Sequence, residues 1–200
     1  MTHTVSGLTM RSILEGIKKV SGPQYKLVLQ MSGLGRFEAE DNWPAADFTP
    51  VATQQELETI FGSIYKLLGE SITRLFLRNY SAGVLQVIAG SDWWQAQLAR
   101  SREIPAGQRL GWSVQMMVQA SKDMQWATAE FQEDDKAYYM LTRNCPICAQ
   151  IAGSHAPLCA SEEQIYGGLV LQLVGYRVVV REVACMAMGA PACKVAFYKK

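Results

Sequence analysis

The chain has 200 residues, the length of one large domain or two small ones. Nineteen Lys and Arg residues face eighteen Asp and Glu residues, so the formal net charge is +1. This balance excludes broad electrostatic binding of nucleic acid, an acidic tail and a polybasic membrane arm. Hydrophobic residues make up 49% of the chain and charged residues only 18%. These fractions exclude disorder, and they require apolar surface to be buried in a core, an interface or a ligand site.

Neither a membrane span nor an export signal is expected. The most apolar stretch, 167–183, is interrupted by Gln172, Glu182 and two arginines, so it falls short of the roughly 18–20 apolar residues of a spanning helix. Residues 1–7 lack a basic start followed by an apolar run. We therefore expect a cytoplasmic location, where cysteines rarely form disulfides.

The first half of the chain is predicted to be helical. Apolar residues recur at helical spacing over 13–20, and Gly22-Pro23 ends that run. A second apolar run follows over 25–34. The stretch 41–50 contains two prolines together with Asp and Asn, and it is typical of a loop.

A longer helical region begins with the motif Thr53-x-x-Glu56, which is a capping box. Gly69 is expected to end or bend this helix, and helical patterning continues over 72–88. Pro105 suits the first turn of another helix. The apolar face of that helix carries Leu110, Val114, Met117 and Val118.

After residue 124 the apolar period changes from helical to alternating. Residues 126–131 and 137–142 predict two antiparallel strands joined by a turn. The β-branched run 176–185 and the alternating run 193–198 predict two more strands, with a turn that contains Gly and Pro between them.

A further helix is predicted between the two pairs of strands. Ser161-x-x-Gln164 matches a second capping box, and Gly175 suits the C′ position after residue 174. The fold class is therefore α+β: a helix-rich N-terminal half packed on an antiparallel sheet, with a C-terminal helix–hairpin zinc site. The chain shows no repeat or low-complexity linker, so we expect 1–200 to form a single domain with a zinc subregion at 145–200.

The cysteines are the strongest functional signal. All five lie within 145–200, although chance would scatter them over the chain. Such clustering in a cytosolic protein indicates metal or redox chemistry before disulfides. The five are Cys145, Cys148, Cys159, Cys185 and Cys193.

Four groups are predicted to form a metal site. Cys159 precedes a helix start, where backbone N–H groups favour a thiolate, and a hairpin brings the end of one strand to the start of the next. Three thiolates and one carboxylate make a closed four-coordinate set that suits structural Zn²⁺. The predicted ligands are Cys159, Glu182, Cys185 and Cys193. Because residues i and i+3 of a regular strand face opposite ways, Glu182 and Cys185 require a bulge or strand end between them.

The motif Cys145-x-x-Cys148 keeps three interpretations. It is a redox pair, an alternative half of the zinc site, or a tight turn of two buried thiols. Buried free cysteines without metal are the corresponding plain interpretation of the whole set. His155 lies near the cluster in sequence, but a loop histidine is more often solvated than metal-bound, so we do not expect it to be a ligand.

One segment resembles a known family. The spacing Cys159-(8)-Gly168-(6)-Gly175-(6)-Glu182-(2)-Cys185-(3)-Gly189-(3)-Cys193 resembles the signature of the 4-vinyl reductase, or hydrocarbon-binding, domain family. It is also similar to the sensor domains of phenol-responsive transcription activators, in which Cys, Glu, Cys and Cys at this spacing hold a structural zinc.

The resemblance implies a compact, usually dimeric domain related to the ligand-binding folds of nitric-oxide-signalling and Golgi-transport proteins. It implies an apolar pocket for a small, often aromatic or isoprenoid-like molecule. Some members are linked to chlorophyll synthesis, which makes a tetrapyrrole one candidate ligand. Haem ligation of the nitric-oxide-sensor type would need a proximal histidine and a Tyr-x-Ser-x-Arg motif, and the sequence has neither.

Sequence features argue against catalysis. The chain has no phosphate-binding glycine loop, and its only histidines are His3 and His155. A closed four-ligand zinc site also leaves no open position for an activated water. A redox role for Cys145 and Cys148 is the best enzymatic alternative.

Aromatic and methionine side chains supply walls for a ligand pocket, although core packing explains each of them singly. The candidate wall residues are Phe61, Tyr65, Phe76, Trp112, Met116, Trp126 and Tyr138. Trp93-Trp94 is assigned to a lid or an interface.

The expected function is a zinc-stabilised binding module for a small hydrophobic ligand, acting as a sensor or carrier. One alternative is a structural or assembly subunit of a protein complex. Another is an enzyme or accessory factor in vinyl-tetrapyrrole reduction. A homodimer and a signalling or biosynthetic protein partner are expected, without direct binding of nucleic acid.

Overall fold

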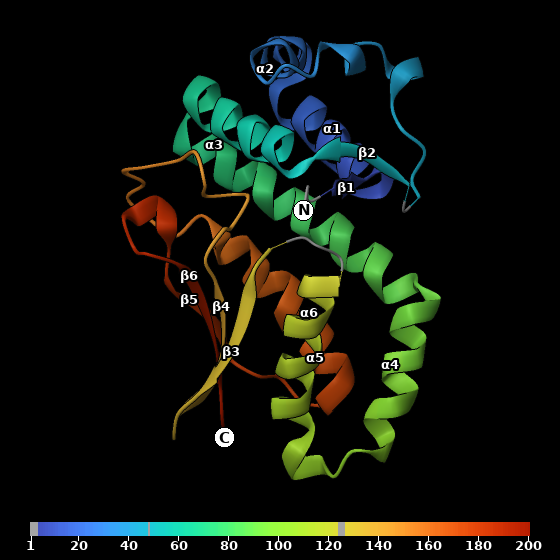
Figure 1. Ribbon diagram of the computed structural model, residues 1–200, viewed down its shortest axis with the longest axis vertical. Helices are drawn as coiled ribbons and strands as arrows, with labels where there is room; N and C mark the ends of the chain where they lie inside the picture. The colour runs from blue at the N-terminus through green and yellow to red at the C-terminus, as the bar shows by residue number, and fades with distance from the viewer. Residues whose placement is uncertain (1–3, 48, 124–126) are drawn as a thin grey trace.

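The computed structural model describes residues 4–47, 49–123 and 127–200. Helices from the first part of the chain pack over and beside a small antiparallel sheet formed near the C-terminus (Figure 1). The helices are α1 (Gly7–Ser21), α2 (Tyr25–Met31), α3 (Gln54–Gly90), α4 (Asp92–Glu103), α5 (Arg109–Asp123) and α6 (Glu162–Val174). The strands are β1 (Thr4–Ser6), β2 (Pro50–Thr53), β3 (Ala129–Glu133), β4 (Ala137–Thr142), β5 (Val180–Ala184) and β6 (Cys193–Tyr198). The predicted α+β class is confirmed.

The main sheet has the strand order β3-β4-β6-β5, and all of its neighbouring strands are antiparallel. Helices α5 and α6 pack against it, and α6 also packs on α3 and α4. Strands β1 and β2 form a separate two-stranded ribbon beside α1. This arrangement places the last strands of the chain against the middle of the long helix α3 (Figure 1).

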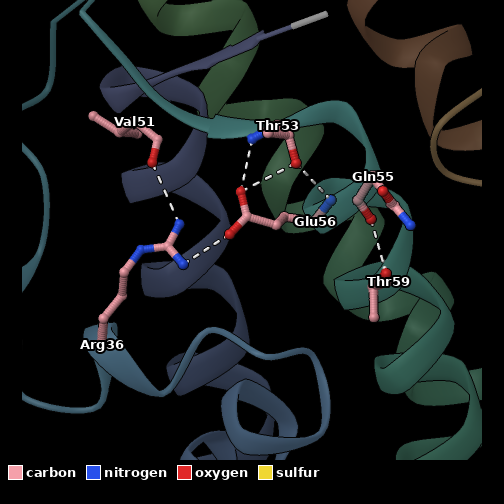
Figure 2. Close-up of polar contacts among 6 residues, drawn as sticks. All are labelled: Arg36, Val51, Thr53, Gln55, Glu56 and Thr59. Atoms are coloured by element: carbon pink, nitrogen blue, oxygen red, sulfur yellow. Dashed lines mark hydrogen bonds and ion pairs between the residues drawn. The ribbon is translucent and has the colours of Figure 1, made fainter. Parts of the chain in front are cut away.

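The start of α3 confirms the predicted capping box. The Thr53 hydroxyl accepts a hydrogen bond from the Glu56 N–H at 3.2 Å, and the Glu56 carboxylate accepts one from the Thr53 N–H at 2.8 Å (Figure 2). Arg36 pairs with the other oxygen of Glu56 at 2.7 Å. Two orphan donors of the helix end are satisfied, and the preceding loop is tied to α3.

Gly69 bends α3, as expected. Its φ of 77° and ψ of 171° are not helical, and only glycine adopts such a conformation without steric cost. Gly175 ends α6 in the left-handed region with φ 81°, which confirms its predicted C′ role.

Two sequence predictions need correction. Ser161 precedes α6 but makes no side-chain cap, because it completes a 3₁₀ turn, Cys159–Ser161, and its hydroxyl donates to the Leu158 carbonyl at 3.4 Å. The predicted strand over 176–185 begins only at Val180, since the chain must first turn after Gly175 before it can pair with β6.

The buried apolar residues form two clusters. The N-terminal core joins α1, α2 and the first half of α3, and it also contains all five cysteines. The sheet core lies between α4, α5, α6 and the main sheet. Val84 on α3 packs against both clusters, so α3 connects them.

Candidate metal centre and ligand cavity

The five cysteines converge at one buried point, although they come from four different segments. Cys145 and Cys148 lie in the loop after β4, and Cys159 opens the 3₁₀ turn before α6. Cys185 follows β5, and Cys193 begins β6. Each of the five is buried and free of disulfide bonds.

The sulfur–sulfur distances show how tightly these thiols are packed. The Sγ of Cys159 lies 3.2 Å from that of Cys145, 3.3 Å from that of Cys148 and 3.8 Å from that of Cys193. The Sγ atoms of Cys148 and Cys185 are 3.6 Å apart. With Zn–S bonds of about 2.3 Å, two sulfurs of a tetrahedral site lie about 3.8 Å apart. The thiols are therefore already at the spacing of ligands around one ion.

Two overlapping sets of four groups have all their ligand atoms within 4.8 Å of one another. One set matches the quartet predicted from sequence: Cys159, Glu182, Cys185 and Cys193. The other consists of Cys145, Cys148, Cys159 and Cys193. The cluster can hold a metal ion, and it brings the C-x-x-C pair into contact with the predicted site.

The bulge that the sequence requires is present. The register of β5 against β6 shifts between Glu182 and Ala184, and both Glu182 and Cys185 are consequently buried on the same side. Glu163 on α6 fixes this geometry. Its carboxylate accepts hydrogen bonds from the Glu182 N–H at 2.9 Å and from Arg181 at 3.1 Å.

The side chain of Glu182 is only 8% exposed, and neither of its oxygens finds a hydrogen-bond partner among the described residues. Burial raises the pKa of Glu182 to about 11, and the charges of Cys185 and Cys193 raise it further. A buried carboxyl without a partner costs several kcal/mol. A cation bound beside the thiols would satisfy these oxygens, so the donor set fits a metal ion.

The donors also indicate which class of ion fits. Thiolates select soft or borderline cations, and Zn²⁺ accepts three or four sulfurs together with a carboxylate oxygen. One backbone group adds to the site: the Met186 N–H donates to the Cys193 Sγ at 3.4 Å. A hydrogen bond of this kind stabilises a thiolate.

His155 is not part of the cluster. Its ring Nδ1 lies 3.2 Å from a carboxylate oxygen of Glu70, and its side chain is 93% exposed. Neither of the two metal-competent sets among the described residues contains a histidine.

A cavity of about 420 Å³ lies between the two cores, within the size range of small-molecule sites. Its walls come from β1 and the start of α1, the second half of α3, the start of α4, the end of α5, and α6. The larger side chains that line it are Tyr80, Trp93, Trp94, Met117 and Tyr166. Ile147, from the C-x-x-C turn, also lines it and connects the cavity to the cysteine cluster.

The apolar wall carries a few polar groups. Glu162 and Tyr166, one helical turn apart on α6, both line the cavity. Burial raises the pKa of Glu162 to about 8, with further contributions from the charges of Cys193 and Cys185. Ser121, on α5, also lines the cavity, and its hydroxyl has no hydrogen-bond partner in the described part of the chain.

The predicted wall residues lie elsewhere, and this expectation is corrected. Phe61 and Phe76 are fully buried in the N-terminal core and Tyr65 packs against it, because the face of α3 that carries them looks toward α1 and α2. Trp112, Met116 and Tyr138 pack against the sheet core. Trp126 lies outside the described residues. Trp93-Trp94 lines the cavity rather than forming the expected lid or interface.

Residues 139–199 match the model of the 4-vinyl reductase domain. The predicted resemblance to this family is confirmed. The matched residues begin within β4 and contain all five cysteines and Glu182. A search of the curated proteins gives no match.

Solved structures with the same overall arrangement include a doubly substituted Tt H-NOX domain. It has a TM-score of 0.50 and 14% identity, and the alignment covers 98% of this chain and 95% of that chain. The phenol-responsive sensory domain of the transcription activator PoxR, solved with phenol, has a TM-score of 0.49 and 14% identity over 89% of this chain and 90% of that chain. An H-NOX protein from S. oneidensis in the Fe(II)NO ligation state has a TM-score of 0.48 and 11% identity over 98% and 100%. At such identity the likeness to the Tt H-NOX domain shows a shared fold and nothing of the ligand.

Within the described residues, no helix is both long and apolar enough to cross a membrane.

Proposed function

We propose that this protein is a zinc-stabilised module that binds a small, largely apolar molecule carrying one hydrogen-bonding group. The observation that carries the proposal is the cavity between the two cores, whose apolar wall holds Glu162, Tyr166 and Ser121. The match of residues 139–199 to the 4-vinyl reductase domain supports a hydrophobic ligand. The role is that of a sensor or carrier, and a homodimer with a protein partner belongs to the same proposal.

The polar groups suit a ligand with one hydroxyl or carbonyl. At neutral pH the raised pKa of Glu162 keeps its carboxyl largely protonated, so it can both donate and accept a hydrogen bond. The volume of about 420 Å³ is at the low end for organic ligands. It favours a molecule of one or two rings over a tetrapyrrole.

The metal would act on the cavity through shared segments. Cys159 stands three residues before Glu162, and Ile147 lies between Cys145 and Cys148. A cation that holds these cysteines would fix both the start of α6 and the C-x-x-C turn where they meet the cavity. Its own contribution is structural: it would tie four segments together and supply folding free energy. A reducing compartment such as the cytoplasm would keep the thiols available for it.

The direct test is to identify what copurifies with the protein, by organic extraction and mass spectrometry. A defined probe pair complements it: 1-naphthol and 1-methylnaphthalene have similar shape, but only the first carries a hydroxyl. We expect 1-naphthol to change the tryptophan fluorescence and to bind about tenfold more tightly, since one hydrogen bond contributes about 1 kcal/mol or slightly more. Equal affinity of the two probes would contradict the polar end of the site.

A cavity-filling variant locates the binding. Ala120 lines the cavity on α5, so Ala120→Phe should weaken 1-naphthol binding at least tenfold. Ala99→Phe is the matched control, because Ala99 is exposed on α4 and outside the cavity lining. If both variants bind 1-naphthol like the parent protein, the ligand does not occupy this cavity.

A further inference from the structure

The cysteine cluster offers more ligands than one tetrahedral ion can use. Five thiols and the Glu182 carboxylate converge, whereas Zn²⁺ in a structural site takes four donors. We infer that the cluster holds two Zn²⁺ ions per chain, bridged by the thiolates of Cys159 and Cys193. This inference rests on the metal-binding part of the proposed function and extends it.

The sharing pattern of the two quartets carries the inference. Cys159 and Cys193 belong to both sets, Cys145 and Cys148 only to the first, and Glu182 and Cys185 only to the second. Two tetrahedra that share one edge require this arrangement: two common ligands and two terminal ligands on each side. The Sγ atoms of the shared pair lie 3.8 Å apart, which is the length of one tetrahedral edge.

A single ion leaves part of the cluster unsatisfied whichever quartet it uses. If it binds the four cysteines of the first set, both oxygens of Glu182 stay buried without a partner. If it binds the second set, Cys145 and Cys148 remain as free thiols at 3.2 and 3.3 Å from the metal-bound sulfur of Cys159. Only two ions give all six buried groups a metal partner.

The charge balance also allows two ions. One Zn²⁺ with three thiolates and a carboxylate has a net charge of about −2, and two Zn²⁺ with five thiolates and a carboxylate have the same net charge. The additional protons leave the thiols for solvent as the second ion binds. The second ion therefore adds no net charge to the buried site.

One contact must change when both ions bind. Cys148 and Cys185 are terminal ligands of different ions, and their Sγ atoms now lie 3.6 Å apart, closer than terminal ligands on opposite sides of a bridged pair. Cys148 lies in the segment after β4, where turns rather than strands hold the chain. A shift of this turn opens the contact without breaking a ladder of the main sheet.

Metal stoichiometry tests the inference on the full chain. After anaerobic reconstitution with zinc, native mass spectrometry should show two ions per chain. One ion per chain would overturn the two-ion site and leave the proposed zinc module intact, whereas no ion would overturn both. Cadmium-113 NMR of the cadmium-loaded protein gives an independent readout. Two thiolate-type resonances coupled through the shared sulfurs are expected, and a single resonance would contradict the bridge.

Variants separate the two halves of the cluster. The double variant Cys145→Ser/Cys148→Ser should lose one of the two ions and keep the other on Cys159, Cys185 and Cys193 with Glu182. Ile147→Val, which leaves all donors in place, is the matched control and should retain two ions. A double variant that still binds two ions would overturn the assignment. If that variant does not fold, the cadmium-113 spectrum of the parent protein decides.

Discussion

Glu182 is positioned by main-chain geometry rather than by hydrogen bonds to its own carboxylate. The bulge after it turns its side chain toward Cys185, and the carboxylate of Glu163 holds its N–H at 2.9 Å. The Glu182 oxygens are left buried and unpaired among the described residues. At the scale of single residues this is the pattern of a ligand held in place by its neighbours.

Replacing Glu182 tests that role. Glu182→Gln keeps the size of the side chain but removes the negative charge, so zinc affinity should fall at least tenfold. Competition with a chromophoric chelator measures the loss. Glu103→Gln, at an exposed position at the end of α4, is the matched control and should leave the affinity unchanged. Equal affinities of the two variants would exclude Glu182 as a ligand.

At the scale of elements, close contacts between helices fix how the N-terminal core is assembled. A Cβ placed on Gly16 of α1 would lie 2.8 Å from the ring of Phe76 on α3. The two helices can therefore approach this closely only because position 16 has no side chain. Phe76 itself stacks on Tyr80, which also lines the cavity.

We expect Gly16→Ala to destabilise the protein by about 1–3 kcal/mol, because the added methyl group overpacks the contact with Phe76. Gly83→Ala is the matched control, since a Cβ there meets no atom within 4 Å. Its higher helix propensity should stabilise α3 by up to about 1 kcal/mol. Urea unfolding at constant zinc measures both values. A neutral Gly16→Ala would mean that α1 and α3 are less tightly coupled than the structure shows.

Elements marked by local chemistry are predictable from the sequence. The Thr53–Glu56 capping box, the bend at Gly69 and the end of α6 at Gly175 each depend on residues close together in the chain. The bulge near Glu182 is also predictable, because the proposed ligands require it. The cap predicted at Ser161 is wrong because its hydroxyl is free to bond the preceding turn rather than cap α6.

The cavity is not predictable in the same way. Helical periodicity identifies an apolar face but not which neighbour that face meets, so it does not reveal that Phe61 and Phe76 face α1 and α2 instead of the cavity. The meeting of Cys145 and Cys148 with Cys159 depends on where the loop after β4 returns. The C-x-x-C spacing indicates a site, but only tertiary structure shows that it joins the other three cysteines.

At the scale of the whole molecule, the segment that matches the 4-vinyl reductase domain contributes to both cores. Its cysteines belong to the N-terminal core, while β5, β6 and α6 contribute to the sheet core. Neither core is built from one continuous half of the chain. We therefore expect residues 1–200 to unfold as one cooperative unit, as the single-domain prediction requires.

The pH dependence of stability should reveal Glu162 at the boundary of these cores. Burial raises its pKa to about 8 from an ordinary value of 4.5. Between these values the folded protein keeps a proton that the unfolded chain has lost. The free energy of unfolding therefore falls as pH rises, by at most about 1.4 kcal/mol per pH unit. This contribution is fully present below pH 4.5 and is lost as pH rises through 8.

Glu162→Gln cannot ionise and should not show this loss. Relative to the parent protein, its free energy of unfolding should rise steadily from about pH 5 to about pH 8 in urea titrations with saturating zinc. Zinc release at low pH affects both proteins alike, so the difference between them isolates Glu162. Glu103→Gln should follow the parent protein at every pH. If the parent and Glu162→Gln curves stay parallel, the carboxyl is already ionised in the folded state, and the cavity is wetter at this end than its lining suggests.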